Sequence, residues 1–358
     1  MSLPKIVFIL PNLNGGGAER VTLNFIKYLK DKLYDLTLIL LEKTPELESS
    51  VPEGIELINL NTRSTSKSFK ALKKQLRETN PNIVFTSHSR LAFLISIIGK
   101  ERKKFVHIAR VQGSPKAEKE YNAYSKTHRA MFGYGFRKAD IVIAQTKEMK
   151  REIEQVYRVR NEKCRVIHNP VDPDIINIQP NTKGRLLPSG KFNFLASGRL
   201  HSVKGFDTLI NAFSSIYSTN NDIHLTILGS DKGEKQNLEH LISSLNLSSV
   251  VTLAGHIDNP AQHYLECEAF VLSSIHEGFP NALLENYCMN TPIISTKCCG
   301  IVEQLIMNGV NGYIAEVNDI HSLSSAMKNS LKLRRKDIKN PQYVGANLNS
   351  IIEECIDL

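Results

Sequence analysis

Two glutamates eight positions apart, Glu277 and Glu285, are the residues of this chain best placed to do chemistry. Between them lies Pro280, which a helix accepts in its first turn and not in its interior, so a helix should begin at about Pro280 or Asn281. Glu277 then precedes the helix, and Glu285 lies about one turn into it. The free N–H groups of a helix start attract anions, and carboxylates accept hydrogen bonds from hydroxyls. The pair therefore suits a ligand with hydroxyls at both ends and phosphate between them, such as a nucleotide-sugar.

Two glutamates at this spacing are more commonly solvated surface charges. The stretch at residues 268–274, shortly before Glu277, makes a functional role for the pair more plausible, because its apolar centre predicts a buried strand. Open α/β sheets bind their ligands at the carboxyl ends of strands, which is where this pair would lie.

A glycine turn near the N-terminus is a second candidate site. The apolar run at 5–10 leads to Gly15, Gly16 and Gly17 and then to a helical stretch from Ala18. Glycines let a ligand approach the backbone closely, although a turn with no ligand role is an equally good interpretation. The spelling is not G-x-G-x-x-G, and no acidic residue closes the strand expected at 36–41, which argues against an NAD enzyme.

Two cations follow another expected strand, at residues 192–197. Arg199 and Lys204 are five residues apart, so both could reach one diphosphate. In isolation, two solvated loop cations would be the simpler interpretation.

Short apolar, β-branched runs alternate with helical stretches, which is the pattern of parallel α/β domains. We expect strands at 5–10, 36–41, 55–60, 83–87, 105–110, 140–144 and 164–167, and then at 192–197, 223–228, 250–254, 269–273, 293–296 and 313–315. Helices fit at 18–31, 67–78, 89–99, 147–157, 205–218, 234–246, 260–265, 281–289 and 301–307. The fold class is therefore α/β, with two doubly wound sheets.

The domain boundary should lie near Pro170. A polar stretch rich in proline and glycine continues from there to Lys191 and suits a linker. We assign residues 1–170 to an N-terminal domain and 171–340 to a C-terminal domain, with 341–358 as a further segment. At 358 residues the chain is long enough for two cores.

Composition is that of an ordinary globular protein, with 41% hydrophobic and 23% charged residues. The apolar run at 6–10 is too short for a secretory signal, and the run at 91–98 is too short to span a bilayer. The six cysteines show no CxxC spacing, which indicates reduced thiols in a cytoplasmic protein.

Charge is unevenly distributed. Residues 1–170 hold 31 Lys and Arg against 17 Asp and Glu, a net +14, whereas residues 171–358 hold 14 against 19, a net −5. Basic residues cluster at 67–77 and 100–104, and no nucleic-acid-binding motif accompanies them. We expect the first half to meet an anionic membrane surface, with a solvated helix face as the alternative for any one cluster.

Several short motifs follow one another along the chain. They are Gly-Gly-Gly-Ala-Glu-Arg at 15–20, Gly198-Arg199-Leu200 with Lys204-Gly205, Gly229, Glu277-Gly278-Phe279-Pro280 with Glu285, and the runs at 300–303 and 308–312. Each motif is weak alone, but the set covers most of the chain and resembles the retaining glycosyltransferases of family four. The resemblance implies the GT-B fold, in which two Rossmann-like domains face each other across a cleft. It implies an acceptor-binding first domain and a second domain that binds the nucleotide-sugar donor.

The resemblance also implies roles for individual residues. Arg199 and Lys204 would hold the donor diphosphate, helped by the backbone of Gly16 and Gly17. Stabilisation of the leaving diphosphate by these groups needs no metal, and no cofactor is implied beyond a UDP-sugar as substrate. The sequence Asp-Pro-Asp at 172–174 has the spelling of a metal-binding DxD motif, but we discount it because it lies in the linker.

On the sugar side, the resemblance implies that Glu285 binds the ribose diol and Glu277 contacts the transferred sugar, a hexose or N-acetylhexosamine. The remaining implied donor contacts are Gly229, Gly278, Phe279, Pro280, Asn281, Ala282 and Leu283. Some family members carry a His after the strand that corresponds to 105–110. Here that loop has none, and His88, after the preceding strand, is the nearest substitute for a base, although a lone His is more often structural.

The acceptor implied by the family is a lipid-linked sugar or polysaccharide precursor, met at the cytoplasmic face of the inner membrane by a peripheral protein. The aromatic residues at 131–136 beside Arg137 and Lys138 could insert into the membrane, with core packing as the alternative use. Residues 341–358 are expected to return to the first domain, as in similar chains.

Two other classes remain open. A nucleotide-sugar epimerase uses two similar domains and needs no acceptor. A non-catalytic nucleotide-sugar binder is the other alternative. It would be favoured if substitutions of Glu277 and Lys204 weakened binding and left every measurable activity unchanged.

Overall fold

The chain divides into two compact units: unit 1 contains Met1–Pro170 and Val344–Leu358, and unit 2 contains Val171–Tyr343. The computed structural model describes residues 3–14, 16–42, 51–62, 65–100, 105–120, 124–176, 178, 187–257, 259–341, 343 and 348–356. Gly15 and residues 101–104, which belong to the glycine turn and to a basic cluster, lie outside the described residues.

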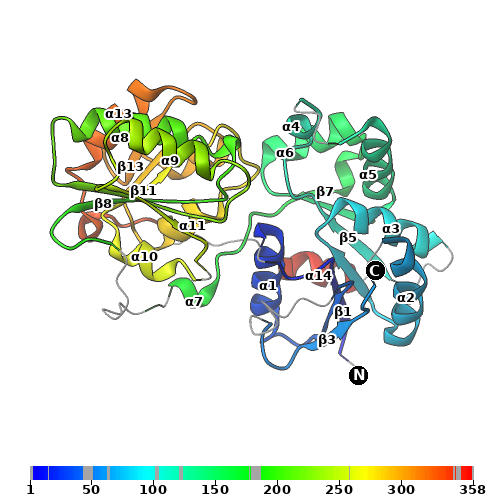
Figure 1. Cartoon of the computed structure of the whole chain (residues 1–358). Coiled ribbons are helices and arrows are strands. Elements are labelled where there is room, and N and C mark those ends of the chain that lie inside the picture. The colour runs from blue at the N-terminus through cyan, green and yellow to red at the C-terminus, as the bar shows by residue number, and fades with distance from the viewer. Residues whose placement is uncertain are drawn as a thin grey trace. The chain divides into compact units, whose positions relative to one another are not determined.

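The described part of unit 1 forms a seven-stranded parallel sheet in the order β3-β2-β1-β4-β5-β6-β7 (Figure 1). Its strands are β1 Lys5–Leu10, β2 Asp35–Leu40, β3 Glu56–Asn59, β4 Ile83–Thr86, β5 Val106–Arg110, β6 Ile141–Ala144 and β7 Cys164–Val166. Its helices are α1 Gly17–Leu29, α2 Thr65–Thr79, α3 Ser89–Lys100, α4 Pro115–Glu120, α5 Lys126–Lys138, α6 Lys147–Glu152 and α14 Leu348–Ile356. The sheet reverses its direction of growth between β1 and β4, the kind of position where ligands bind in open α/β sheets.

The strands of unit 1 are apolar because helices cover both faces of the sheet. One core joins α1 and α14 to β1, β2, β4, β5 and β6, and here Leu348, Ile351 and Ile352 of α14 are buried among the side chains of α1 and the sheet. Other cores lie under α2 and α3 and under α5 and α6. The C-terminal helix is thus part of the fold of unit 1.

The described part of unit 2 forms a six-stranded parallel sheet in the order β10-β9-β8-β11-β12-β13. The strands are β8 Phe192–Ser197, β9 Ile223–Leu228, β10 Val251–Gly255, β11 Ala269–Leu272, β12 Ile293–Thr296 and β13 Gly312–Ala315. The helices are α7 Pro173–Ile176, α8 Phe206–Tyr217, α9 Lys235–Ser244, α10 Ala261–Glu266, α11 Asn281–Cys288, α12 Gly300–Leu305 and α13 Ile320–Ser330. This sheet reverses between β8 and β11.

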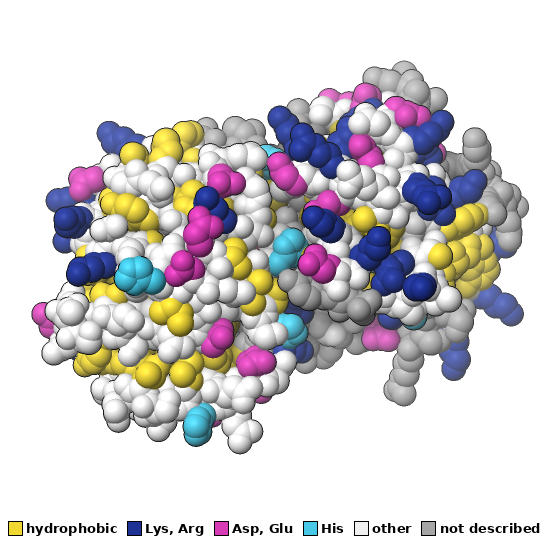
Figure 2. Space-filling view, turned by 90° about the horizontal axis from the view of Figure 1, so that it is seen from above, with side chains coloured by type: hydrophobic (Ala, Val, Ile, Leu, Met, Phe, Trp, Pro, Cys, Tyr) yellow, Lys and Arg dark blue, Asp and Glu magenta, His cyan; other side chains and the backbone are white. Residues whose placement is uncertain are grey.

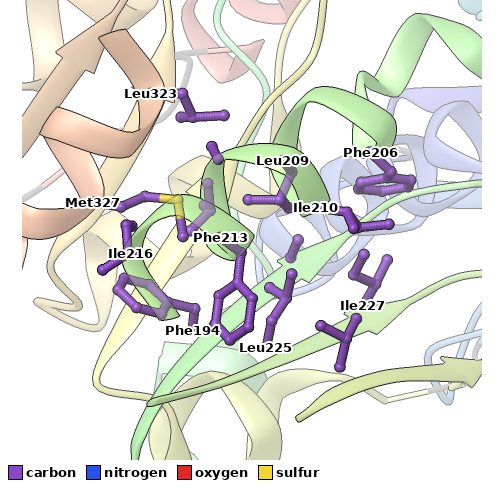
Figure 3. Close-up of a cluster of buried hydrophobic side chains, with 14 of the residues drawn as sticks. Phe194, Phe206, Leu209, Ile210, Phe213, Ile216, Leu225, Ile227, Leu323 and Met327 are labelled. Atoms are coloured by element: carbon purple, nitrogen blue, oxygen red, sulfur yellow. The ribbon is translucent and has the colours of Figure 1, made fainter. Parts of the chain in front are cut away.

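A large core holds one face of that sheet in place. Leu209, Ile210, Phe213 and Ile216 of α8 pack on side chains of β8 and β9, and α13 adds Leu323 and Met327 (Figure 3). Burying such side chains contributes about 1.5–3 kcal/mol each. The opposite face is covered by α10, α11 and α12. A rigid sheet of this kind fixes where the loops after β8 and β11 begin.

The expected α/β class and every expected strand are confirmed, each strand to within one residue at either end. The continuous α-helix expected over 147–157 is wrong in its second half: α6 ends at Glu152, and Ile153–Tyr157 forms a π-helix before Arg158, whose φ is +56°. Core packing is the observed use of two aromatic residues of α5, since Phe132 and Phe136 are buried, whereas Tyr134 is half-buried and Met131 is exposed.

Candidate active site

The loops after β8 and β11 meet at the point where the sheet of unit 2 reverses. Ser273 donates a hydrogen bond from Oγ to the carbonyl of Lys204, at 2.8 Å, and the N–H of Ile275 donates to the carbonyl of Val203, at 2.8 Å. Adjacent strands whose crossovers run in opposite directions leave a crevice at their carboxyl ends. The two loops are tied to each other at this edge.

An ion pair joins these loops. Nζ of Lys204 lies 2.5 Å from Oε1 of Glu277, and the hydroxyl of Ser274 donates to the same oxygen at 2.7 Å. The side chains of Lys204 and Glu277 are only 17% and 15% exposed, so water screens their attraction weakly. Within the described residues no hydrogen bond falls on Oε2 of Glu277, which leaves this oxygen for a ligand.

Glycines allow the close approach on which this geometry depends. Gly205, directly after Lys204, has φ +59°, and a Cβ there would lie 2.3 Å from the carbonyl oxygen of Ser273. The stem of Lys204 runs over Gly198, where a Cβ would meet its Cε at 3.1 Å. A Cβ on Gly229 would lie 1.8 Å from the carbonyl oxygen of Gly198. Gly229 therefore acts through its lack of a side chain, which lets the ends of β8 and β9 touch.

Helix α11 begins at Asn281 with Pro280 as its N-cap, as predicted. Asn281 and Ala282 are half-buried and Leu283 is buried in the core, so Leu283 can meet a ligand only through its backbone. Phe279 is also buried, and Gly278 is half-buried. An α-helix has no internal partner for the N–H groups of its first turn, which here begins at Asn281.

Glu285 lies in α11 and is 9% exposed. Burial, followed by the charge of Glu285, raises the pKa of Cys288 to about 11. A carboxylate kept this far out of bulk water forms strong hydrogen bonds with hydroxyls that reach it.

Arg199 lies two residues after the end of β8 and is exposed. In the described part of the chain its guanidinium forms no hydrogen bond or ion pair, whereas the neighbouring Leu200 is fixed through a bridge to Asp231. The structure therefore brings Lys204 and Glu277 into contact, and it leaves Arg199 on an ordered backbone with its charge unused.

The glycine turn of unit 1 is covered by a carboxylate. A Cβ on Gly16 would lie 2.2 Å from Oε2 of Glu19, so this side chain folds back over the N-terminus of α1. Glu at the third helical position commonly reaches back in this way. A phosphate could use the amides of Gly16 and Gly17 only after Glu19 moves.

His88 lies close to Glu19, across the reversal point of the sheet in unit 1. Its Nε2 is 3.7 Å from Oε1 of Glu19, while its buried Nδ1 has no partner among the described residues. Burial, and secondarily the charge of Arg110, lowers the pKa of His88 to about 4. The ring is neutral near neutral pH, and its low pKa makes it a weak proton acceptor.

Sequence reasoning missed two residues that the geometry ties to this site. Ser274 shares Oε1 of Glu277 with Lys204, and Thr296 at the end of β12 donates to the carbonyl of Ser274 at 2.5 Å. The signal for Ser274 was its place two residues after β11, where a short donor can reach a neighbouring loop.

In the described residues no three His, Cys, Asp or Glu side chains are grouped as metal ligands. Oδ1 of Asp172 accepts a hydrogen bond from the N–H of Asp174, at 3.1 Å, at the start of α7. Among the helices that the structure describes, none combines the length and apolar character that a bilayer crossing requires.

Comparison with known proteins matches two family models in succession. Residues 15–175 match Glycosyltransferase Family 4, and residues 178–347 match Glycosyl transferases group 1. A glycosyltransferase of Methanocaldococcus jannaschii is 31% identical over 75% of this chain and 70% of its own length. The N-acetylgalactosamine-N,N'-diacetylbacillosaminyl-diphospho-undecaprenol 4-alpha-N-acetylgalactosaminyltransferase of Campylobacter jejuni is 25% identical over 93% of this chain and 92% of its own.

Among solved structures, HepE of Anabaena in complex with UDP and glucose superimposes with a TM-score of 0.81, at 18% identity, over 99% of this chain and 98% of its own. The two Rossmann-like units are those of the GT-B fold, and this part of the sequence prediction is confirmed.

Proposed function

The chain belongs to the glycosyltransferases of group 1 and family 4, and from that premise we propose that it transfers a sugar from a UDP-sugar, bound by unit 2, to an acceptor bound by unit 1. The observation that carries the proposal is the ion pair of Lys204 and Glu277, at 2.5 Å, at the reversal point of the sheet in unit 2.

The donor diphosphate is assigned to the cations after β8. Arg199 has an unused guanidinium, and Lys204 is held nearby by Glu277 and by the backbone of its loop. Glu285, nearly buried in α11, accepts hydrogen bonds from the two ribose hydroxyls. The HepE complex with UDP and glucose, in the same fold, supports UDP as the carrier.

Transfer proceeds with retention of configuration. The bond between the anomeric carbon and the diphosphate oxygen breaks, the acceptor oxygen bonds to that carbon on the same face, and the departing phosphate takes the acceptor's proton. Arg199 and Lys204 stabilise the charge that grows on the leaving group, with no metal required. Glu277 contacts the sugar, a hexose or N-acetylhexosamine, through Oε2.

The acceptor is a lipid-linked sugar or polysaccharide precursor. The Campylobacter relative, whose acceptor is linked to diphospho-undecaprenol, supports this class. Unit 1 meets the anionic surface in which such a lipid lies, as a peripheral protein. On the face presented in Figure 2, Lys and Arg side chains gather on unit 1 more than on unit 2.

The test is transfer from a panel of nucleotide-sugars to an undecaprenol-diphosphate-linked glycan, with the anomeric configuration of the product read by NMR. We expect a UDP-sugar to be used, with the donor's configuration kept. Conversion of the donor without acceptor would indicate an epimerase instead. Unchanged turnover in both Glu277→Gln and Lys204→Ala would reject catalysis at this site, with Glu239→Gln and Lys328→Ala, both exposed in unit 2, as controls.

A further inference from the structure

Arg110, the last residue of β5, is a buried cation without an anion. Its side chain is 2% exposed, and among the described residues it forms no ion pair. Nη2 donates to Oδ1 of Asn169 at 2.5 Å, whereas Nε and Nη1 are buried and have no partner. Burial alone lowers the pKa of Arg110 to about 9, which still leaves it charged at neutral pH.

Its surroundings hold further unused nitrogen atoms. Nδ1 of His88 and Nε2 of Gln112 are also buried without partners in the described part of the chain. The amide of Gln145 fixes the loop after β5, because its Nε2 donates to the carbonyls of Val111 and Gln112 at 2.8 and 2.6 Å. These side chains follow β4, β5 and β6, so they share the carboxyl edge of one sheet.

A buried charge left unpaired is strongly destabilising, and buried N–H groups are rarely left without acceptors. A neutral sugar would satisfy the donors but not the charge. Arg is the side chain that best matches phosphate and carboxylate, so the missing partner is an anion.

We propose that Arg110 recognises an anionic group, phosphate or carboxylate, on the acceptor within unit 1. The inference rests on the proposed function and narrows its acceptor class to charged molecules. It makes Arg110 a specificity-determining residue for the acceptor, separate from the donor-binding cations Arg199 and Lys204 in unit 2.

The test uses inorganic phosphate and glucuronate as probes on protein saturated with UDP, so that the donor site is already filled. Either anion should raise the melting temperature of the wild-type protein by mass action. Arg110→Met should lose this shift, with the affinity for the anion falling about tenfold or more. Arg77→Met, which removes an exposed cation of α2, should keep it. A response to phosphate alone indicates a phosphorylated acceptor, and a response to glucuronate alone an acidic sugar.

Four outcomes would overturn the proposal. The first two are an anion response that Arg110→Met retains and the absence of a response to either probe in the wild type. Another is a loss of UDP affinity in Arg110→Met, because the anion would then be the donor's phosphate. The fourth is a fall of more than about 5 °C in the melting temperature of the unliganded variant, which would mark Arg110 as a structural residue that stabilises the fold through its bond to Asn169. Failure of UDP to bind the wild type would count against the proposed function instead.

Discussion

At the scale of single residues, the contact between Lys204 and Glu277 decides what the site in unit 2 can do. Lys204→Ala would leave the carboxylate of Glu277, which is 15% exposed, without its cation. It would also remove the positive charge proposed to stabilise the leaving diphosphate. We expect kcat/KM to fall about 100-fold or more, the loss typical of one preorganised electrostatic contact. Initial-rate measurements of kcat/KM check this prediction. The control is Lys328→Ala, which removes an exposed lysine of α13. A loss of less than about threefold would contradict the role, since it corresponds to under 1 kcal/mol.

Two buried histidines of unit 1 predict a loss of stability in acid. Burial, assisted by Arg110, lowers the pKa of His88 to about 4, and burial lowers the pKa of His107 to about 3. The unfolded chain takes up protons on these rings as the pH falls through about 6.5, and the folded chain does not. The stability present above pH 6.5 is therefore lost toward pH 4, and at pH 5 each ring accounts for about 2 kcal/mol.

The check is urea unfolding of the wild type and His88→Asn at pH 7.5 and pH 5. The variant should lose about 2 kcal/mol less than the wild type between the two values. Equal losses of unfolding free energy in the wild type and in His88→Asn would contradict this prediction, because His88 would then have the same pKa in the folded and unfolded chain.

Residue types and spacing were enough to predict the start of α11 and the position of Lys204 and Glu277 in loops after strand ends, because proline rules and strand ends are local signals. They could not predict that Arg110 is buried. That depends on which strands become neighbours, and β4, β5 and β6 are far apart in the sequence. The contact of Glu19 with Gly16 is local, since a Glu at the third helical position commonly reaches back to the helix start.

At the scale of elements, the turn between β8 and α8 fixes the position of Lys204. Gly205 has φ +59° and lies against the carbonyl of Ser273, whereas Gly190 has φ +78° and nothing within 4 Å of a Cβ. Gly190→Ala should cost only the backbone strain, about 1 kcal/mol. Gly205→Ala adds a clash, and we expect it to destabilise the protein by at least about 2 kcal/mol more and to weaken UDP binding.

Denaturant unfolding of both variants measures the difference in stability, and UDP titration measures the change in binding. Equal unfolding free energies in Gly205→Ala and Gly190→Ala would mean that the loop after β8 relaxes freely and does not position the lysine.

Strands were predicted closely because buried parallel strands are short, apolar and β-branched. Helices α4, α7, α13 and α14 were not predicted. The segment of α13 holds four serines, which weakens its helical signal, although Asp319 caps it by accepting from the N–H of Ser322. Helix α14 is short and depends on packing against α1 and the sheet, which no local pattern shows.

At the scale of the whole molecule, the excess of positive charge lies in the first half of the chain, +14 against −5. Lys67, Lys70, Lys74 and Arg77 are exposed on one face of α2, while Leu72 and Leu76 are buried on the other. Neutralising Lys67, Lys70 and Arg77 to Gln should weaken binding to anionic vesicles about 100-fold at low salt, at about 1 kcal/mol per charge.

Vesicle co-sedimentation measures this binding, and the matched control replaces the exposed Lys332, Lys336 and Lys339 of unit 2 with Gln. Equal loss in both triple variants would indicate attraction by net charge alone. Absence of wild-type binding would reject the membrane-facing surface.

The central claim is that one site in unit 2 binds the nucleoside diphosphate of the donor, and calorimetric titration of UDP tests it most directly. UDP should bind the wild type, Glu239→Gln and Lys328→Ala alike. Arg199→Gln, Lys204→Ala and Glu285→Gln should each bind about tenfold or more weakly, since each loses a hydrogen bond to a charged group. Undiminished UDP affinity in all three variants would contradict the account.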